Sequence, residues 1–181
     1  MTHPLVEQLR FTRSEWVRAL QDVTDQEARR QFPPMNCISW MIGHMAWQEQ
    51  MYWLERAQGM VVAPGLEHMV GFGRPASTPP LAQMWDAWHA VTEAADPYLD
   101  SLTGDMLLGQ YAVQGAVKPA TIGTNLLRVV YHYWYHIGES QAVRQLLGHR
   151  NLPDFVGDIH LQAPYRREDA VTEDRIAVAK H

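Results

Sequence analysis

The sequence predicts an all-α protein, a four-helix bundle with a long crossover between its second and third helices. Apolar residues recur at steps of three and four along four long stretches, as in helices that bury one face. No stretch of the 181 residues shows the alternation of apolar and polar residues that would indicate a convincing strand. About twenty residues rich in glycine and proline separate the second helical stretch from the third, so the topology need not be simple up-and-down.

The first helix is expected from about Pro4 to Leu20, with His3 or Thr2 as its cap. Its proline lies in the first turn, where the missing N–H costs nothing. Thr24 and Glu27 have the spacing of a capping box, which predicts a short helical turn directly after the first helix.

The second helix is expected from about Cys37 to Gln58, capped by Asn36 and ended by Gly59. Its first half is apolar nearly all round, which indicates a central, well-covered helix. His44 lies in that half. A buried histidine needs a partner, and a metal ion is one such partner.

The crossover, Met60 to Thr78, is expected to be irregular, and loops of that length are usually functional or mobile, so this one could cover a pocket. The third helix follows, and Pro97 is expected to kink or break it. Residues 101–120 are then expected to form a loop with a short extended piece near residues 111–113.

The last helical stretch, about Thr121 to Gly148, carries His132 and His136 four residues apart. That spacing returns to nearly the same helix face, so the two imidazoles project side by side and make half of a metal site. The chain has nine histidines, and the alternative is a chance pair satisfied by hydrogen bonds. A third ligand from another helix would favour a metal, and His44 is the candidate.

Two other candidates rank lower. Asp86 and His89, three residues apart in the third helix, are a further ligand pair, although Asp86 is expected to face solvent. Cys37 is a candidate nucleophile, because a helix start lowers a thiol pKa, but a structural role is favoured. The sequence contains no nucleophile elbow, Walker loop or dinucleotide-type turn, so a metal would be the only visible catalyst.

Composition limits the partners and the compartment. A formal charge of −5 without a basic stripe argues against nucleic-acid binding. No apolar run of signal-peptide or membrane-span type is present, and a single cysteine suits a reducing compartment, so a cytoplasmic protein is expected. Residues 1–165 are expected to form one domain, and residues 166–181 a flexible tail.

Two motifs resemble those of the DinB-like family, also called the DinB/YfiT-like family. They are Ser39 to His44 (SWMIGH) in the second helix and His132 to Glu139 (HYWYHIGE) in the last, followed by Arg144 and Leu147-Gly148. The resemblance extends in order from the first helix to about Pro153.

The resemblance implies a site for one divalent metal ion, held by His44, His132 and His136. Glu139 stands where the family commonly has glutamine, and an acid there could orient His136 or its bound water, or could simply be solvated. Three imidazoles suit zinc or nickel, and also iron or manganese.

The resemblance also implies a bundle of unusual connectivity, homodimers, and members that act as transferases or isomerases with bacillithiol, mycothiol or related thiols. A metal-dependent thiol S-transferase is therefore the first functional hypothesis. A metal-dependent hydrolase and a non-catalytic binding module with a structural metal, or none, are the alternatives.

Overall fold

The structure is a computed structural model that describes residues 2–154 and 156–166. The long helices are α1 (Pro4–Leu20), α3 (Ile38–Glu49) continued by the π-helix η1 (Gln50–Arg56), α5 (Leu81–Ser101) and α7 (Ile122–Leu146). The short elements are α2 (Asp25–Ala28), α4 (Leu66–Val70), α6 (Gly104–Leu108), β1 (Gln110–Val113), β2 (Ala116–Thr121) and α8 (Ile159–Gln162). The all-α class is confirmed.

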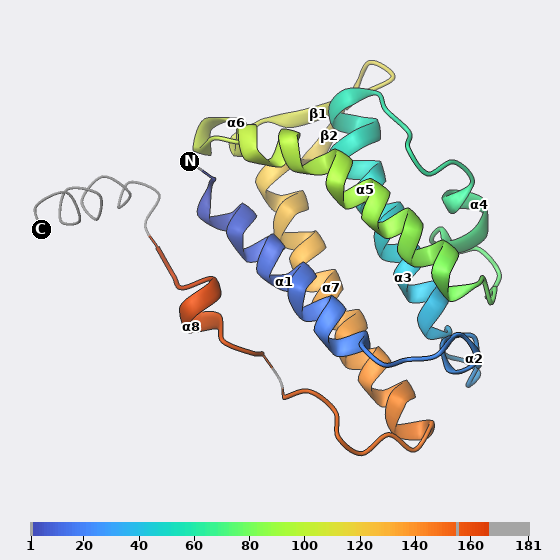
Figure 1. The fold of residues 1–181 in the computed structure, drawn as a ribbon. Coiled ribbons are helices and arrows are strands. Elements are labelled where there is room, and N and C mark those ends of the chain that lie inside the picture. Colours follow the sequence, from blue (N-terminus) through green and yellow to red (C-terminus); the bar gives the residue numbers. More distant parts are fainter. Residues whose placement is uncertain (1, 155, 167–181) are drawn as a thin grey trace, which may run out of the picture.

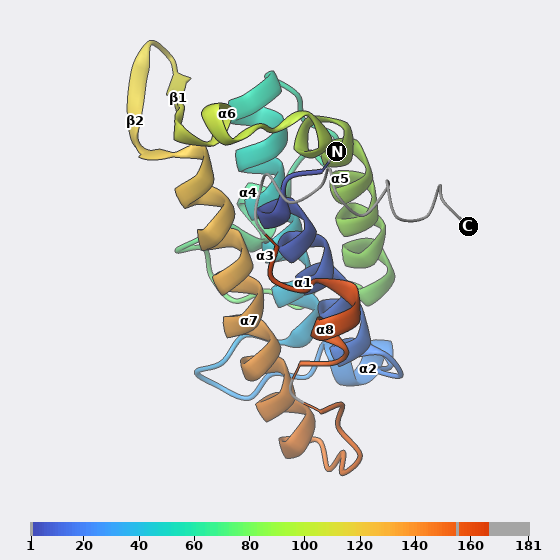
Figure 2. The ribbon, with the colours of Figure 1, turned by 90° about the vertical axis from the view of Figure 1, so that its left-hand side faces the viewer.

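The long helices form two pairs, in which α1 packs along α7 and α3 packs along α5 (Figure 1). Helices α1 and α7 run in one direction, and α3 and α5 run in the other (Figures 1 and 2). The long crossover carries the chain back to the end at which α3 began, so α5 starts there and runs parallel to α3. This topology is not simple up-and-down, a possibility that the length of the crossover had left open.

Local signals in the sequence set several helix ends. The side chain of His3 accepts a hydrogen bond at the start of α1, and Thr24 and Glu27 form the predicted capping box of α2. Thr121 caps α7 in the same manner. Gly148 follows the end of α7 with a φ of 93°, a left-handed conformation that glycine adopts without a steric penalty.

The predicted second helix differs from the observed one in two respects. Cys37, and not Asn36, is the residue that precedes the first turn of α3, and its side chain makes no capping hydrogen bond. The helix widens into a π-helix at Gln50. The side-chain oxygen of Gln50 accepts hydrogen bonds from the backbone N–H groups of Val62 and Ala63, at 3.0 and 2.8 Å, so this part of the helix anchors the crossover.

The connections on either side of α5 contain more regular structure than expected. The crossover includes α4. Residues 101–120 contain α6 and an antiparallel hairpin of β1 and β2, joined through Gln114 and Gly115, whose φ angles of 51° and 78° suit a tight two-residue turn. Helix α5 continues through Pro97 to Ser101, so the break considered at this proline is absent.

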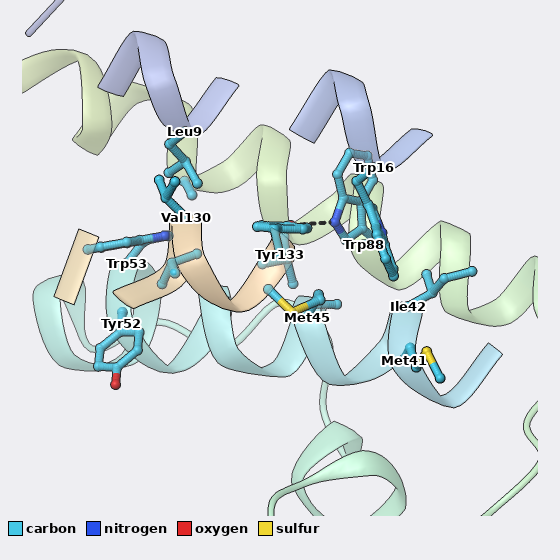
Figure 3. Packing of buried hydrophobic residues seen from close by; sticks show 14 of the residues in the cluster. Leu9, Trp16, Met41, Ile42, Met45, Tyr52, Trp53, Trp88, Val130 and Tyr133 are labelled. Carbon is cyan, nitrogen blue, oxygen red and sulfur yellow. Dashed lines mark hydrogen bonds between the residues drawn. The ribbon is translucent and has the colours of Figure 1, made fainter. Parts of the chain in front are cut away.

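A buried polar network joins the four long helices inside the apolar core. Trp88 of α5 donates a hydrogen bond to the Tyr133 hydroxyl of α7 at 2.7 Å, drawn as a dashed line in Figure 3. Tyr133 donates to Glu49 of α3 at 2.6 Å, and Arg13 of α1 pairs with the same carboxylate. Burial lowers the pKa of Arg13, but Glu49 more than offsets this and holds that pKa above its ordinary value.

The domain bounds remain predictions. The proposed tail begins at Arg166, and residues 167–181 lie outside the described residues. None of the helices in the described part of the chain combines the length and the apolar character that a membrane crossing requires.

Candidate metal centre

The structure brings together the three histidines that the sequence singled out. His44 projects from α3, and His132 and His136 project from successive turns of α7. Each offers one ring nitrogen, and the three nitrogens all lie within 4.8 Å of one another. The ring centroids are 5.1 Å apart for His44 and His132, and 4.6 Å apart for His132 and His136.

Hydrogen bonds fix the orientation of two of the rings. The Nδ1 of His44 donates to the backbone carbonyl of Val70 at 2.7 Å, and the Nδ1 of His136 donates to the Glu139 carboxylate at 2.7 Å. Because both acceptors require a proton on Nδ1, the Nε2 atom of each ring carries a free lone pair. Histidine ligands of metal ions are commonly held in this way by a carbonyl or a carboxylate.

Two nitrogens of the cluster are buried without a partner. They are Nδ1 of His132 and Nε2 of His136, for which no hydrogen-bond partner exists among the described residues. Buried polar atoms are rarely left unsatisfied, because each loses its hydrogen bond to water. A cation that accepts these lone pairs would satisfy them, so the donor set fits a divalent metal ion.

A family model described as the DinB superfamily matches residues 8–140. The chain belongs to the DinB superfamily. The match includes all three histidines and Glu139, whereas the Arg144 and Leu147-Gly148 positions lie beyond it. No curated protein shows significant similarity to the chain.

Close packing of the crossover against α3 completes the centre of this DinB superfamily protein. A Cβ atom at Gly43 would lie 2.3 Å from Met84 Sδ and 3.3 Å from the Val70 side chain. Glycine therefore leaves room for Met84 of α5 and Val70 of α4 to pack against α3, and the carbonyl of Val70 accepts from His44. On the other side, the Trp40 ring stacks on His44 with the centroids 4.5 Å apart.

The surroundings favour the neutral form of two of the imidazoles, those of His44 and His132. Burial and the nearby His136 lower the pKa of His44 to about 4, despite opposing contributions from the Val70 carbonyl and Glu139. Burial also lowers the pKa of His132 to about 3, with contributions from His136, His44 and Arg128. Neutral imidazole is the form that binds metal, so the free protein is prepared for an ion near neutral pH.

This electrostatic arrangement predicts a pH dependence for the metal-free protein. An unfolded chain takes up protons at these histidines near pH 6.5, whereas the folded chain does so only near pH 4 for His44 and pH 3 for His132. The unfolded state therefore binds more protons between these values, and the free energy of unfolding should fall as the pH drops from about 6.5 towards 4. Urea titrations in the presence of a chelator measure it.

The window from pH 6.5 to 5 is the informative one, because most carboxylates stay ionised there. The His132→Gln variant should lose stability less steeply than the unmodified chain over this window. An equal slope in the two proteins would contradict the assignment of the pH dependence to this ring.

The centre lies nearest to solvent at His132. His44 and His136 are buried, with 4% and 5% of their surfaces exposed, whereas His132 is partly exposed. Tyr131 and Tyr135, the neighbours of His132 on the outer side of the helix, are 65% and 68% exposed. A small molecule would thus reach the three histidines past His132.

The weaker candidates do not join the centre. Asp86 and His89 are both exposed on α5, outside the group of three histidines. Cys37 is fully buried, and its Sγ lies 3.3 Å from the Ser39 hydroxyl and donates to the Ser77 carbonyl at 3.4 Å. These contacts agree with the favoured structural role of the thiol.

Sequence reasoning missed the Val70 carbonyl, because a backbone oxygen leaves no residue-type signal. Trp40 could have been found, since it precedes His44 by four residues and shares its helix face. For Glu139 the sequence left two roles open, and the hydrogen bond to His136 favours orientation of that ring over simple solvation.

Proposed function

We propose that His44, His132 and His136 bind one divalent metal ion and that the protein is a metal-dependent thiol S-transferase. The observation that carries this proposal is that His132 and His136 each have a buried, unpartnered ring nitrogen in a group of three histidines whose ligand atoms lie within 4.8 Å of one another. Zinc is the first candidate and nickel the second, and the ligand type also suits iron and manganese.

A bound ion would stabilise the thiolate form of a small thiol at neutral pH. The chain's own residues position the site. Val70 and Glu139 orient two of the rings, and the partly exposed His132 leaves access for a ligand. The sulfur would attack an electrophilic carbon, forming a C–S bond while the leaving group departs with its electron pair. The proton of the thiol passes to solvent, so no separate base is needed.

An assay with zinc-loaded protein and 1-chloro-2,4-dinitrobenzene tests this function, with bacillithiol, mycothiol and glutathione added in turn. Release of chloride and formation of the thioether should require both the ion and a thiol. Metal-dependent consumption that no thiol changes would instead indicate a hydrolase. Absence of any reaction with the metal intact would favour a non-catalytic binding module.

We also propose that the protein is a homodimer. Large apolar side chains away from the metal centre are exposed, among them Val17 of α1 and Leu146 of α7, at 42% and 56% exposure. Burying them against a second copy would remove apolar surface from water. Sedimentation equilibrium should give a mass of two chains of 20.7 kDa at micromolar concentration. A mass of one chain at every concentration would rule the dimer out.

A further inference from the structure

Arg128 lies on α7 one helical turn before His132, on the side from which the metal centre is reached. Side chains four residues apart on a helix are neighbours, with their Cβ atoms ~5–6 Å apart. Arg128 is exposed.

Arg128 has no partner of its own, unlike several other arginines. Ion pairs with carboxylates hold Arg10, Arg13, Arg18, Arg29 and Arg74. Within residues 2–154 and 156–166, no hydrogen bond or ion pair is formed by Arg128. Its guanidinium is therefore free to bind a ligand, and guanidinium groups match the geometry of carboxylates and other oxyanions.

The possible metal ligands themselves carry no negative charge. The group of possible ligands in the described residues consists of three histidines and contains no carboxylate. The Glu139 carboxylate accepts a hydrogen bond from Nδ1 of His136. Three neutral imidazoles would not neutralise a divalent ion, and an anion that contacts both the ion and the Arg128 guanidinium would relieve the repulsion between these two cations.

We propose that Arg128 binds the oxyanion of an anionic thiol whose sulfur occupies the open position of the centre. This inference rests on the proposed thiol-dependent function and narrows its substrate class to thiols that carry a carboxylate or a similar group. Arg128 is thus a specificity-determining residue. Binding releases the thiol proton to solvent and leaves the guanidinium protonated.

Two small thiols that differ in charge test the inference, 3-mercaptopropionate and 2-mercaptoethanol. Each is titrated into cobalt-loaded protein, and the visible absorption of the ion reports binding without any turnover. The unmodified chain should bind 3-mercaptopropionate about tenfold more tightly, the scale of a charge-assisted contact at an exposed site. The preference should shrink at 1 M salt.

The Arg128→Gln variant should lose this preference while retaining its affinity for 2-mercaptoethanol. Arg150→Gln is the matched control, because it removes an exposed arginine beyond the end of α7 and changes the net charge equally. An unchanged preference in Arg128→Gln would overturn the role of this residue alone. A cobalt spectrum that responds to neither thiol would overturn the thiol-dependent function and this inference together.

Discussion

Replacing Glu49 with glutamine should lower the free energy of unfolding by ~3–5 kcal/mol, the usual cost of removing one partner from a buried ion pair. Arg13 would remain charged and buried. Its remaining carboxylate partner would be the partly exposed Asp96, whose Oδ1 lies 2.9 Å from Arg13 Nη1. Since ~1 kcal/mol shifts the melting temperature by ~2–4 °C in a domain of this size, a drop of roughly 6–20 °C is expected. Thermal and urea denaturation measure it.

The Asp96→Asn variant is the control, because the side chain of Asp96 is 43% exposed and such pairs contribute ~1 kcal/mol or less. A double replacement, Arg13→Met with Glu49→Leu, should recover much of the lost stability, because no unpaired charge stays buried. If Glu49→Gln is as stable as the unmodified chain, the network contributes little to folding.

The same network lies beside the histidines. Glu49 follows His44 by five residues on α3, and Tyr133 is the residue directly after His132 on α7. The hydrogen bond between Tyr133 and Glu49 therefore fixes the relative position of the two helices that carry the proposed ligands. Polar groups are costly to bury, but here they determine which residues of α3 and α7 face each other.

The elements that the sequence predicted best depend on local signals. Helix α1 has the bounds expected from its capping residue, its first-turn proline and its apolar period. The side-by-side histidines of α7 follow from helix geometry alone, because a spacing of four brings them to one face. Helix geometry does not identify His44 as the third ligand. It was predicted because a histidine within an apolar helix needs a partner.

The missed features depend on contacts between distant parts of the chain. The π-helix at Gln50 is associated with hydrogen bonds to Val62 and Ala63, which a helical pattern does not contain. The hairpin left a weak signal in the Gln114-Gly115 turn. Its two short strands are mostly exposed, however, and their sequences show little alternation of apolar and polar residues. The carbonyl of Val70 is positioned by tertiary packing at Gly43.

Alanine at His44, His132 or His136 should abolish stoichiometric metal binding. Two imidazoles at an open site bind a divalent ion far more weakly than three, and each loss also leaves a cavity at the centre. Metal analysis after dialysis against a weak chelator measures the content. In the unmodified chain, metal at a hundredfold excess over Kd should stabilise the fold by ~2.7 kcal/mol, and the alanine variants should lose this increment.

Two further variants make this result specific. Glu139→Gln should weaken metal binding by about tenfold, at the lower end of the usual range for a residue that orients a ligand, because the amide oxygen still accepts from His136. His89→Ala removes an exposed histidine outside the centre and should leave the metal content unchanged. Full metal content in all three alanine variants at the centre would exclude these histidines as the ligands, whereas loss in His89→Ala would place the ion elsewhere.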